Sequence, residues 1–145
     1  MPAGLIPNEA LAVTLQELLG VVATNPIPWM LVLWKNNIEP DADTVWADLE
    51  ECDFGGYVRG TLSRSEWTEP VVADGCAHST CGVEPMEWNV TSGPTQTVYG
   101  YAFLDNTMGV LRFVQRFDDA DIEPLAVPGT VSMLPEYTYT SHECE

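Results

Sequence analysis

Hydrophobic positions near the N-terminus repeat with the period of a helix. After Asn8, a good N-cap residue, apolar side chains recur on one helical face at Leu11, Leu15, Leu18, Leu19 and Val22. The prolines at 26 and 28 then end the helix, because proline has no amide donor and forces its predecessor towards extended geometry. The pattern predicts a short N-terminal helix or arm within residues 1–26, whose leucine side either packs on the domain or contacts a neighbour.

From residue 27 onwards the pattern changes to that of strands. The run 29–34 is apolar on both faces, which is typical of a strand in the middle of a sheet. Shorter runs between turn formers predict further strands at 57–62, 67–72, 86–91, 96–104, 110–117 and 130–140. The acid-rich stretch 39–53 predicts a short helix or a loop.

The clearest pair of strands is 96–104 with 110–117. The five residues 105–109 between them include a glycine and fit a hairpin loop. On the second strand Arg112 and Arg116 alternate with apolar side chains. Alternation in a strand predicts that one face meets the core, whereas the face with the arginines meets solvent or a partner.

Length and composition favour a single folded domain. The 145 residues are 46% hydrophobic and 10% aromatic, so the chain lacks the signature of a disordered protein. Regularly spaced short strands are typical of sandwiches and barrels. We therefore expect a mainly β fold: one antiparallel β-sandwich or jelly-roll-like domain over residues 27–145, behind a short N-terminal α-helix.

Charge narrows the possible partners. The chain has 22 acidic and five basic residues, for a formal net charge of −17. Nucleic-acid binding needs lysine and arginine to displace counterions from phosphate, so the sequence argues against that function, and an anionic membrane surface is disfavoured for the same reason. The chain has neither a spanning apolar segment nor the pattern of a signal peptide, so we expect synthesis in a cytoplasm without export by the general route.

Four cysteines are candidates for disulfide or metal chemistry: Cys52, Cys76, Cys81 and Cys144. Cys76 and Cys81 are expected to pair, since both lie in one predicted loop of small and polar residues that can bring two Cα atoms within about 7 Å. The alternative is a zinc site of Cys76, His78 and Cys81 with His142 or Cys144. Because the C-x-H-x-x-C spacing matches no strong zinc pattern, a disulfide or free buried thiols are favoured, and no cofactor is expected.

Catalytic and calcium-binding motifs are weak in this sequence. A catalytic triad needs a histidine base, and the two histidines are His78 in the cysteine-rich segment and His142 near the chain end. Aspartates cluster at residues 41–43 and 118–121, but neither cluster follows the EF-hand loop. A solvated acidic surface and a protein that is not an enzyme are the expected interpretations.

Three short motifs occur together in a familiar order. They are LWKNNIEP at residues 33–40, DFGGY at 53–57 and TVYGY at 97–101. With the leading helix, this order resembles a diffuse group of small virion-associated proteins of tailed bacteriophages, over roughly residues 5–117. The cysteine-rich segment and the very acidic balance are not part of the group's pattern.

The resemblance implies a structural component of a virus particle. The first expectation is a capsid decoration or cement protein that holds neighbouring capsid subunits from outside; the alternative is a receptor- or glycan-binding module of a tail or fibre. Such proteins are often homo-oligomers, with trimers favoured, and their partners are the major capsid protein or other virion proteins. The candidate interface residues are Leu11, Leu15, Leu18, Arg112 and Arg116.

Overall fold

The computed structural model describes residues 4–19, 29–63, 66–73, 76–82 and 84–140 of the chain. The protein is mainly β, with antiparallel sheets and one short N-terminal helix, as predicted from the sequence. The boundary predicted at residue 26 lies outside the described residues. Helix α1 spans Asn8–Leu18, and the strands are β1 (Trp29–Trp34), β2 (Gly60–Leu62), β3 (Val71–Ala73), β4 (Cys76–Thr80), β5 (Met86–Val90), β6 (Gly100–Asp105), β7 (Val110–Arg116), β8 (Gly129–Met133) and β9 (Glu136–Thr140).

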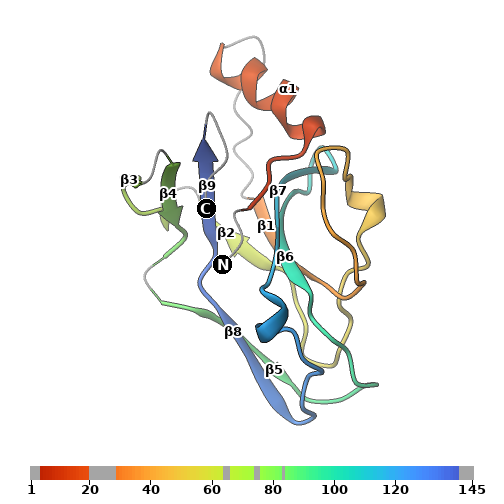
Figure 1. The fold of residues 1–145 in the computed structure, drawn as a ribbon. Coiled ribbons are helices and arrows are strands. Elements are labelled where there is room, and N and C mark those ends of the chain that lie inside the picture. Colours follow the sequence, from red (N-terminus) through yellow and green to blue (C-terminus); the bar gives the residue numbers. More distant parts are fainter. Residues whose placement is uncertain (1–3, 20–28, 64–65, 74–75, 83, 141–145) are drawn as a thin grey trace.

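A four-stranded sheet in the order β2-β1-β6-β7 forms the centre of the molecule (Figure 1). Strand β1 has the predicted bounds and lies between two neighbours in the sheet, and both of its faces are apolar because each packs in a buried cluster. Leu31 and Leu33 belong to one buried cluster, and Val32 and Trp34 belong to a second cluster on the opposite face. The predicted hairpin is confirmed as β6 and β7.

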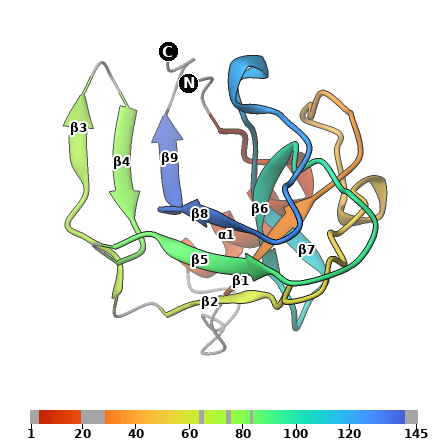
Figure 2. The same cartoon turned by 90° about the horizontal axis from the view of Figure 1, so that it is seen from below.

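The remaining strands form a long bent ribbon beside this sheet. Strand β4 pairs with β9, and the next strand, β5, pairs with β8, which precedes β9. The segment with β4 and β5 therefore runs antiparallel to the segment with β8 and β9 (Figure 2). Pro85 and Pro135 lie between the two pairs, where proline interrupts ladder hydrogen bonding. The single strand predicted at 130–140 is therefore wrong: the segment forms two strands that serve different sheets.

Two other sequence predictions need correction. The strand expected at 67–72 is reduced to β3, at the edge of the β3-β4-β9 sheet, and β4 occupies the segment that was expected to be a loop. The acid-rich stretch 39–53 agrees with its prediction of a short helix or a loop, since it is a loop with one 3-10 turn at Trp46–Asp48.

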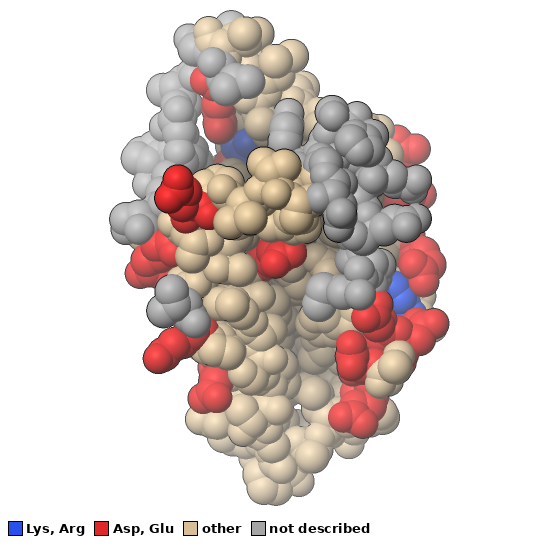
Figure 3. Space-filling view, turned by 60° about the vertical axis from the view of Figure 1, so that its left-hand side comes forward, with Lys and Arg blue, Asp and Glu red and all other residues tan. Residues whose placement is uncertain are grey.

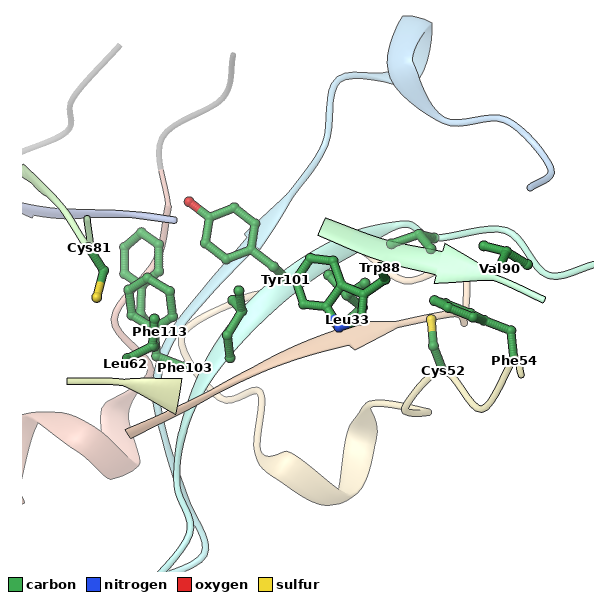
Figure 4. Close-up of a cluster of buried hydrophobic side chains, with 12 residues drawn as sticks. Leu33, Cys52, Phe54, Leu62, Cys81, Trp88, Val90, Tyr101, Phe103 and Phe113 are labelled. Carbon is green, nitrogen blue, oxygen red and sulfur yellow. The ribbon is translucent and has the colours of Figure 1, made fainter. Parts of the chain in front are cut away.

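The main hydrophobic core lies between the four-stranded sheet and the ribbon. Phe103 and Phe113 stack with their ring centroids 5.1 Å apart. Trp88 of β5 packs into the same cluster and donates its indole N–H to the carbonyl of Val58 at 2.7 Å. Figure 4 shows these rings, with Cys81 and Cys52 at opposite ends of the cluster. The buried rings hold the ribbon on the sheet, and Trp46 and Leu49 of the 39–53 loop pack against the second cluster on the opposite sheet face.

Gly100 provides a test of this packing. A Cβ built on Gly100 would lie 2.1 Å from the carbonyl oxygen of Gln115 and 2.6 Å from the ring of Trp34. Gly100→Ala is therefore expected to lower the free energy of unfolding by about 2–3 kcal/mol, measured by urea denaturation. The control is Gly109→Ala, at a positive φ of 70° with nothing within 4 Å of the added Cβ. It is expected to cost about 1 kcal/mol from backbone strain alone, and equal losses in the two variants would contradict the close approach at Gly100.

Candidate functional site

Three leucines of helix α1 and its C-cap are exposed to solvent, whereas Glu9, Thr14 and Glu17 form hydrogen bonds with strand β7. Ala10 is fully buried, whereas the exposed fractions of Leu11, Leu15 and Leu19 are 48%, 53% and 68%. In Figure 1 the helix lies at one end of the molecule, above the four-stranded sheet. Most surface helices bury their apolar stripe against the core, so this orientation is the reverse of the usual one. We call the surface formed by Leu11, Leu15 and Leu19 the leucine face.

The first turn of the helix is fixed to the sheet by hydrogen bonds. The Glu9 carboxylate accepts the backbone N–H of Leu111 at 2.7 Å. Just before the helix, Leu5 forms a reciprocal backbone pair with Val114, at 2.8 Å in both directions. Asn8 is not the N-cap as predicted: the cap is Pro7, and the Asn8 side chain donates to Asp43 instead.

A buried ion cluster fixes the second half of the helix. The Arg112 guanidinium donates to Glu17 at 2.6 Å and to Asp105 at 2.8 Å, and it reaches the hydroxyl of Thr14 at 3.4 Å. It also lies 5.4 Å from the centre of the Trp29 ring, within cation–π range. Burial works to lower the pKa of Arg112, but the hydrogen bonds to Asp105 and Glu17 outweigh it and raise the pKa, so the group stays charged. One cation thus joins α1 to β6, β7 and β1.

Arg112 corrects the prediction that this side chain faces solvent or a partner. Its side chain is 1% exposed, as is that of Asp105. The strand register shifts here: Phe103 pairs with Phe113, but the next residue, Leu104, pairs with Leu111, so Arg112 is the extra residue of a β-bulge. The alternation rule fails for two reasons, because the bulge re-aims the side chain and α1 covers the face that was expected to be free.

Arg116 is also held within the chain. Its side chain is 13% exposed, and it pairs with Glu39 at 3.1 Å, donates to the Ile38 carbonyl at 3.0 Å and lies over the Tyr99 ring. This arginine therefore fastens Glu39, at the start of the 39–53 loop, to the sheet. Of the candidate interface residues, Leu11 and Leu15 are exposed, while the side chain of Leu18 lies outside the described part.

The predicted disulfide between Cys76 and Cys81 is wrong. Cys81 is a free thiol, buried in the main core, whereas Cys76 is disulfide-bonded; Cys144 lies outside the described residues. Cys76 belongs to β4, and Cys81 follows the end of that strand and pairs with Trp67 in an isolated bridge. Because the segment is extended and not a loop, its two cysteines are carried apart.

The zinc alternative is not supported by the described residues. They contain no group of three or more His, Cys, Asp or Glu side chains that would hold a metal ion. His78 pairs instead with Glu136 of β9 at 3.2 Å, and the neighbouring Ser79 donates to the Thr68 carbonyl at 2.7 Å. His142 and Cys144 lie outside the described part.

Acidic side chains cover much of the surface. Figure 3 shows them spread over one face, with little basic surface between them. Every basic residue in the described part of the chain has a carboxylate partner: Lys35 pairs with Asp53, Arg59 with Glu51, and Arg112 and Arg116 as above. Within the described residues, none of the helices has the length and apolar character to cross a membrane. Five basic residues cannot neutralise 22 acidic ones, so the protein keeps a large excess of negative charge.

The Arg112 cluster predicts a large difference between two arginine variants. Arg112→Leu leaves Asp105 buried without its cation, so we expect it to lower the free energy of unfolding by about 3–5 kcal/mol. Arg59→Leu removes an ion pair with Glu51 whose side chains are 31% and 22% exposed, and we expect a loss of about 1 kcal/mol. Urea denaturation measures both, and a loss at Arg112 no larger than at Arg59 would count against the cluster.

The free thiols predict protection from alkylation. Burial raises the pKa of Cys52 to about 12 and also raises the pKa of Cys81, so neither thiol is ionised or accessible at pH 8. Iodoacetamide without reductant is expected to leave both unmodified in the native protein and to label both in denaturant, with Cys76 unlabelled in either case. Peptide mass spectrometry reads out the result, and a Cys76–Cys81 linkage would contradict the structure.

Comparison with known proteins finds no match of any kind. No protein-family model matches the chain, and no curated protein or solved structure shows a significant similarity to it.

Proposed function

We propose that this protein is a non-enzymatic structural component of a bacteriophage particle, in first place a capsid decoration or cement protein. On this proposal it docks on the major capsid protein or another virion protein through the leucine face of α1. The observation that carries the proposal is the outward orientation of Leu11, Leu15 and Leu19, each at least 48% exposed. Burial of such a stripe is favourable and needs a partner with an apolar groove.

The charge of this chain indicates which charges should surround the apolar groove of the partner. The chain carries a net charge of −17, and α1 contains Glu9 and Glu17 but no basic residue. A partner surface with basic residues around an apolar centre would be attracted to it, whereas an acidic surface would be repelled. An outward-facing component that never touches packaged DNA is compatible with this balance. The oligomer implied by the resemblance needs the same compensation by a partner or by cations, since copies with this charge repel one another.

The disulfide at Cys76 supports a location outside the reducing cytoplasm. Disulfides persist on secreted proteins and on the surfaces of virions and are rare in the cytosol. A virion protein made in the host cytoplasm would acquire this bond only after release.

We also propose that the ribbon and the four-stranded sheet make up a sandwich of the jelly-roll kind. Trp88 and Val131 of the β5–β8 pair pack against the cluster that contains Leu31, Leu33 and Phe103 of the central sheet. This face-to-face packing of two β layers supports the arrangement.

A matched pair of surface variants tests the docking role. Leu15 and Val58 are both exposed apolar residues, at 53% and 68%, but only Leu15 lies on the leucine face. Each variant, Leu15→Gln and Val58→Gln, is supplied in trans during infection by a phage that lacks the gene. Quantitative mass spectrometry of purified particles measures the copies incorporated. We expect Leu15→Gln to reduce incorporation about tenfold, as the loss of one buried leucine contact implies, and Val58→Gln to match the wild type.

The wild-type copy number separates the two structural roles. Hundreds of copies per particle indicate cement, and a handful indicates the receptor- or glycan-binding tail or fibre module. Absence of the wild-type protein from purified particles would overturn both. Equal incorporation of the two variants would overturn the docking role of the leucine face.

A further inference from the structure

A half-open cavity of about 440 Å³ lies between α1 and the edge of the sheet system. Cavities of this size are in the range that holds small molecules. Its described lining comes from α1, four strands, the end of β2 and the segment before β3: Thr14, Glu17, Trp29, Leu62, Trp67, Ser79, Arg112 and Tyr137. None of these lining residues belongs to the leucine face.

Three aromatic rings make up the apolar wall of the cavity. Tyr137 lies 6.0 Å from Trp29 and 6.4 Å from Trp67 between ring centroids. All three rings also contact Phe103 in the core, at 5.6–6.4 Å. Because the rings are braced from behind by a fully buried side chain, the wall is preformed, which lowers the entropy cost of binding a flat apolar molecule.

Most polar groups of the wall already have partners within the protein. Glu17 and Thr14 are bound by Arg112, and Ser79 donates to the Thr68 carbonyl. The indole N–H of Trp29 is buried and has no hydrogen-bond partner in the described part of the chain. An unpaired buried donor is costly, and a ligand acceptor would satisfy it. A saccharide, with several hydroxyl groups to satisfy, finds too few free partners here.

Charge at the cavity disfavours anionic ligands. Arg112 and Glu17 line the cavity, and Asp105 pairs with the same guanidinium, so the ion cluster holds one guanidinium and two carboxylates. The chain as a whole carries −17. An anion would enter against both the local excess of carboxylate and the field of the whole protein.

We propose that this cavity binds a neutral, mostly apolar small molecule, about the size of a fused aromatic ring pair, that carries one hydrogen-bond acceptor for the indole N–H of Trp29. The site is separate from the docking surface, because none of its described lining residues belongs to the leucine face. Its ligand therefore binds the isolated protein, whether or not the protein is part of a particle.

The test uses Prodan, a neutral naphthalene dye with a carbonyl acceptor, against the full-length protein. We expect one molecule to bind with a blue shift of its emission. The anionic dye 8-anilino-1-naphthalenesulfonate is expected to bind at least tenfold more weakly, and N-acetylglucosamine at millimolar concentration is expected not to displace Prodan. Absence of Prodan binding, equal binding of the sulfonate dye or displacement by the sugar would each overturn the assigned ligand class.

Two tryptophan variants test the acceptor contact. Trp29→Phe keeps an aromatic ring but removes the N–H donor, so we expect Prodan affinity to fall about fivefold to tenfold. Trp46→Phe is the matched control, since Trp46 packs on the other buried cluster and is expected to leave affinity unchanged. Unchanged affinity in Trp29→Phe would overturn the contact.

A second measurement does not depend on the variants. In ¹H–¹⁵N spectra of the wild-type protein, saturating Prodan is expected to shift the indole resonance of Trp29 downfield and to leave that of Trp46 in place. An unmoved Trp29 resonance would overturn the assignment even if a variant failed to fold.

Discussion

A guanidinium with almost no access to water costs several kcal/mol to bury unless its N–H groups find acceptors of opposite charge. Arg112 meets that condition by drawing Asp105 from the hairpin and Glu17 from the helix to within 2.8 Å. Once the helix is held by Glu17, the face that carries Ala10 and Thr14 must lie on the sheet. Leu11 and Leu15 each follow one residue after Ala10 and Thr14, so they lie on a different face of the helix and are turned to solvent. The orientation of α1 therefore follows from one buried charge.

This orientation links the fold to the proposed role. A helix fixed through polar contacts keeps its apolar stripe accessible to a partner without unfolding. The negative charge of the protein keeps copies apart in solution, so they do not bury the stripe against one another. A partner that supplies both an apolar groove and basic residues would relieve the exposed leucines and the excess charge together. The same helix closes one side of the cavity beneath it, where Arg112 again contributes to the wall.

Local patterns predicted the elements that depend on neighbouring residues alone. The central strand β1 and the β6–β7 hairpin follow from a continuous apolar run and from alternation around a glycine-containing turn, and both are confirmed. The pattern also marked Leu11 and Leu15 as one face of a helix, although it left open whether that face was buried.

Features that depend on distant partners were missed. The bulge that buries Arg112 depends on the pairing register of β6 and β7. The carboxylates that bind Arg112 lie seven and 95 residues away in the sequence. Strand β4 has a polar sequence that resembles a loop and becomes a strand because β9 pairs with it. Nothing in the sequence indicated that Trp29 and Trp67 line a cavity, since large aromatic residues usually belong to the core.

The central claim is that the ion cluster holds α1 with its leucine face in solvent. It is tested most directly by solvent paramagnetic relaxation of leucine methyl groups, with a neutral gadolinium chelate added to the free wild-type protein. The methyl resonances of Leu11 and Leu15 are expected to broaden strongly, while those of Leu31 and Leu33, which are fully buried, stay sharp. Protection of Leu11 and Leu15 equal to that of the two core leucines would contradict the account.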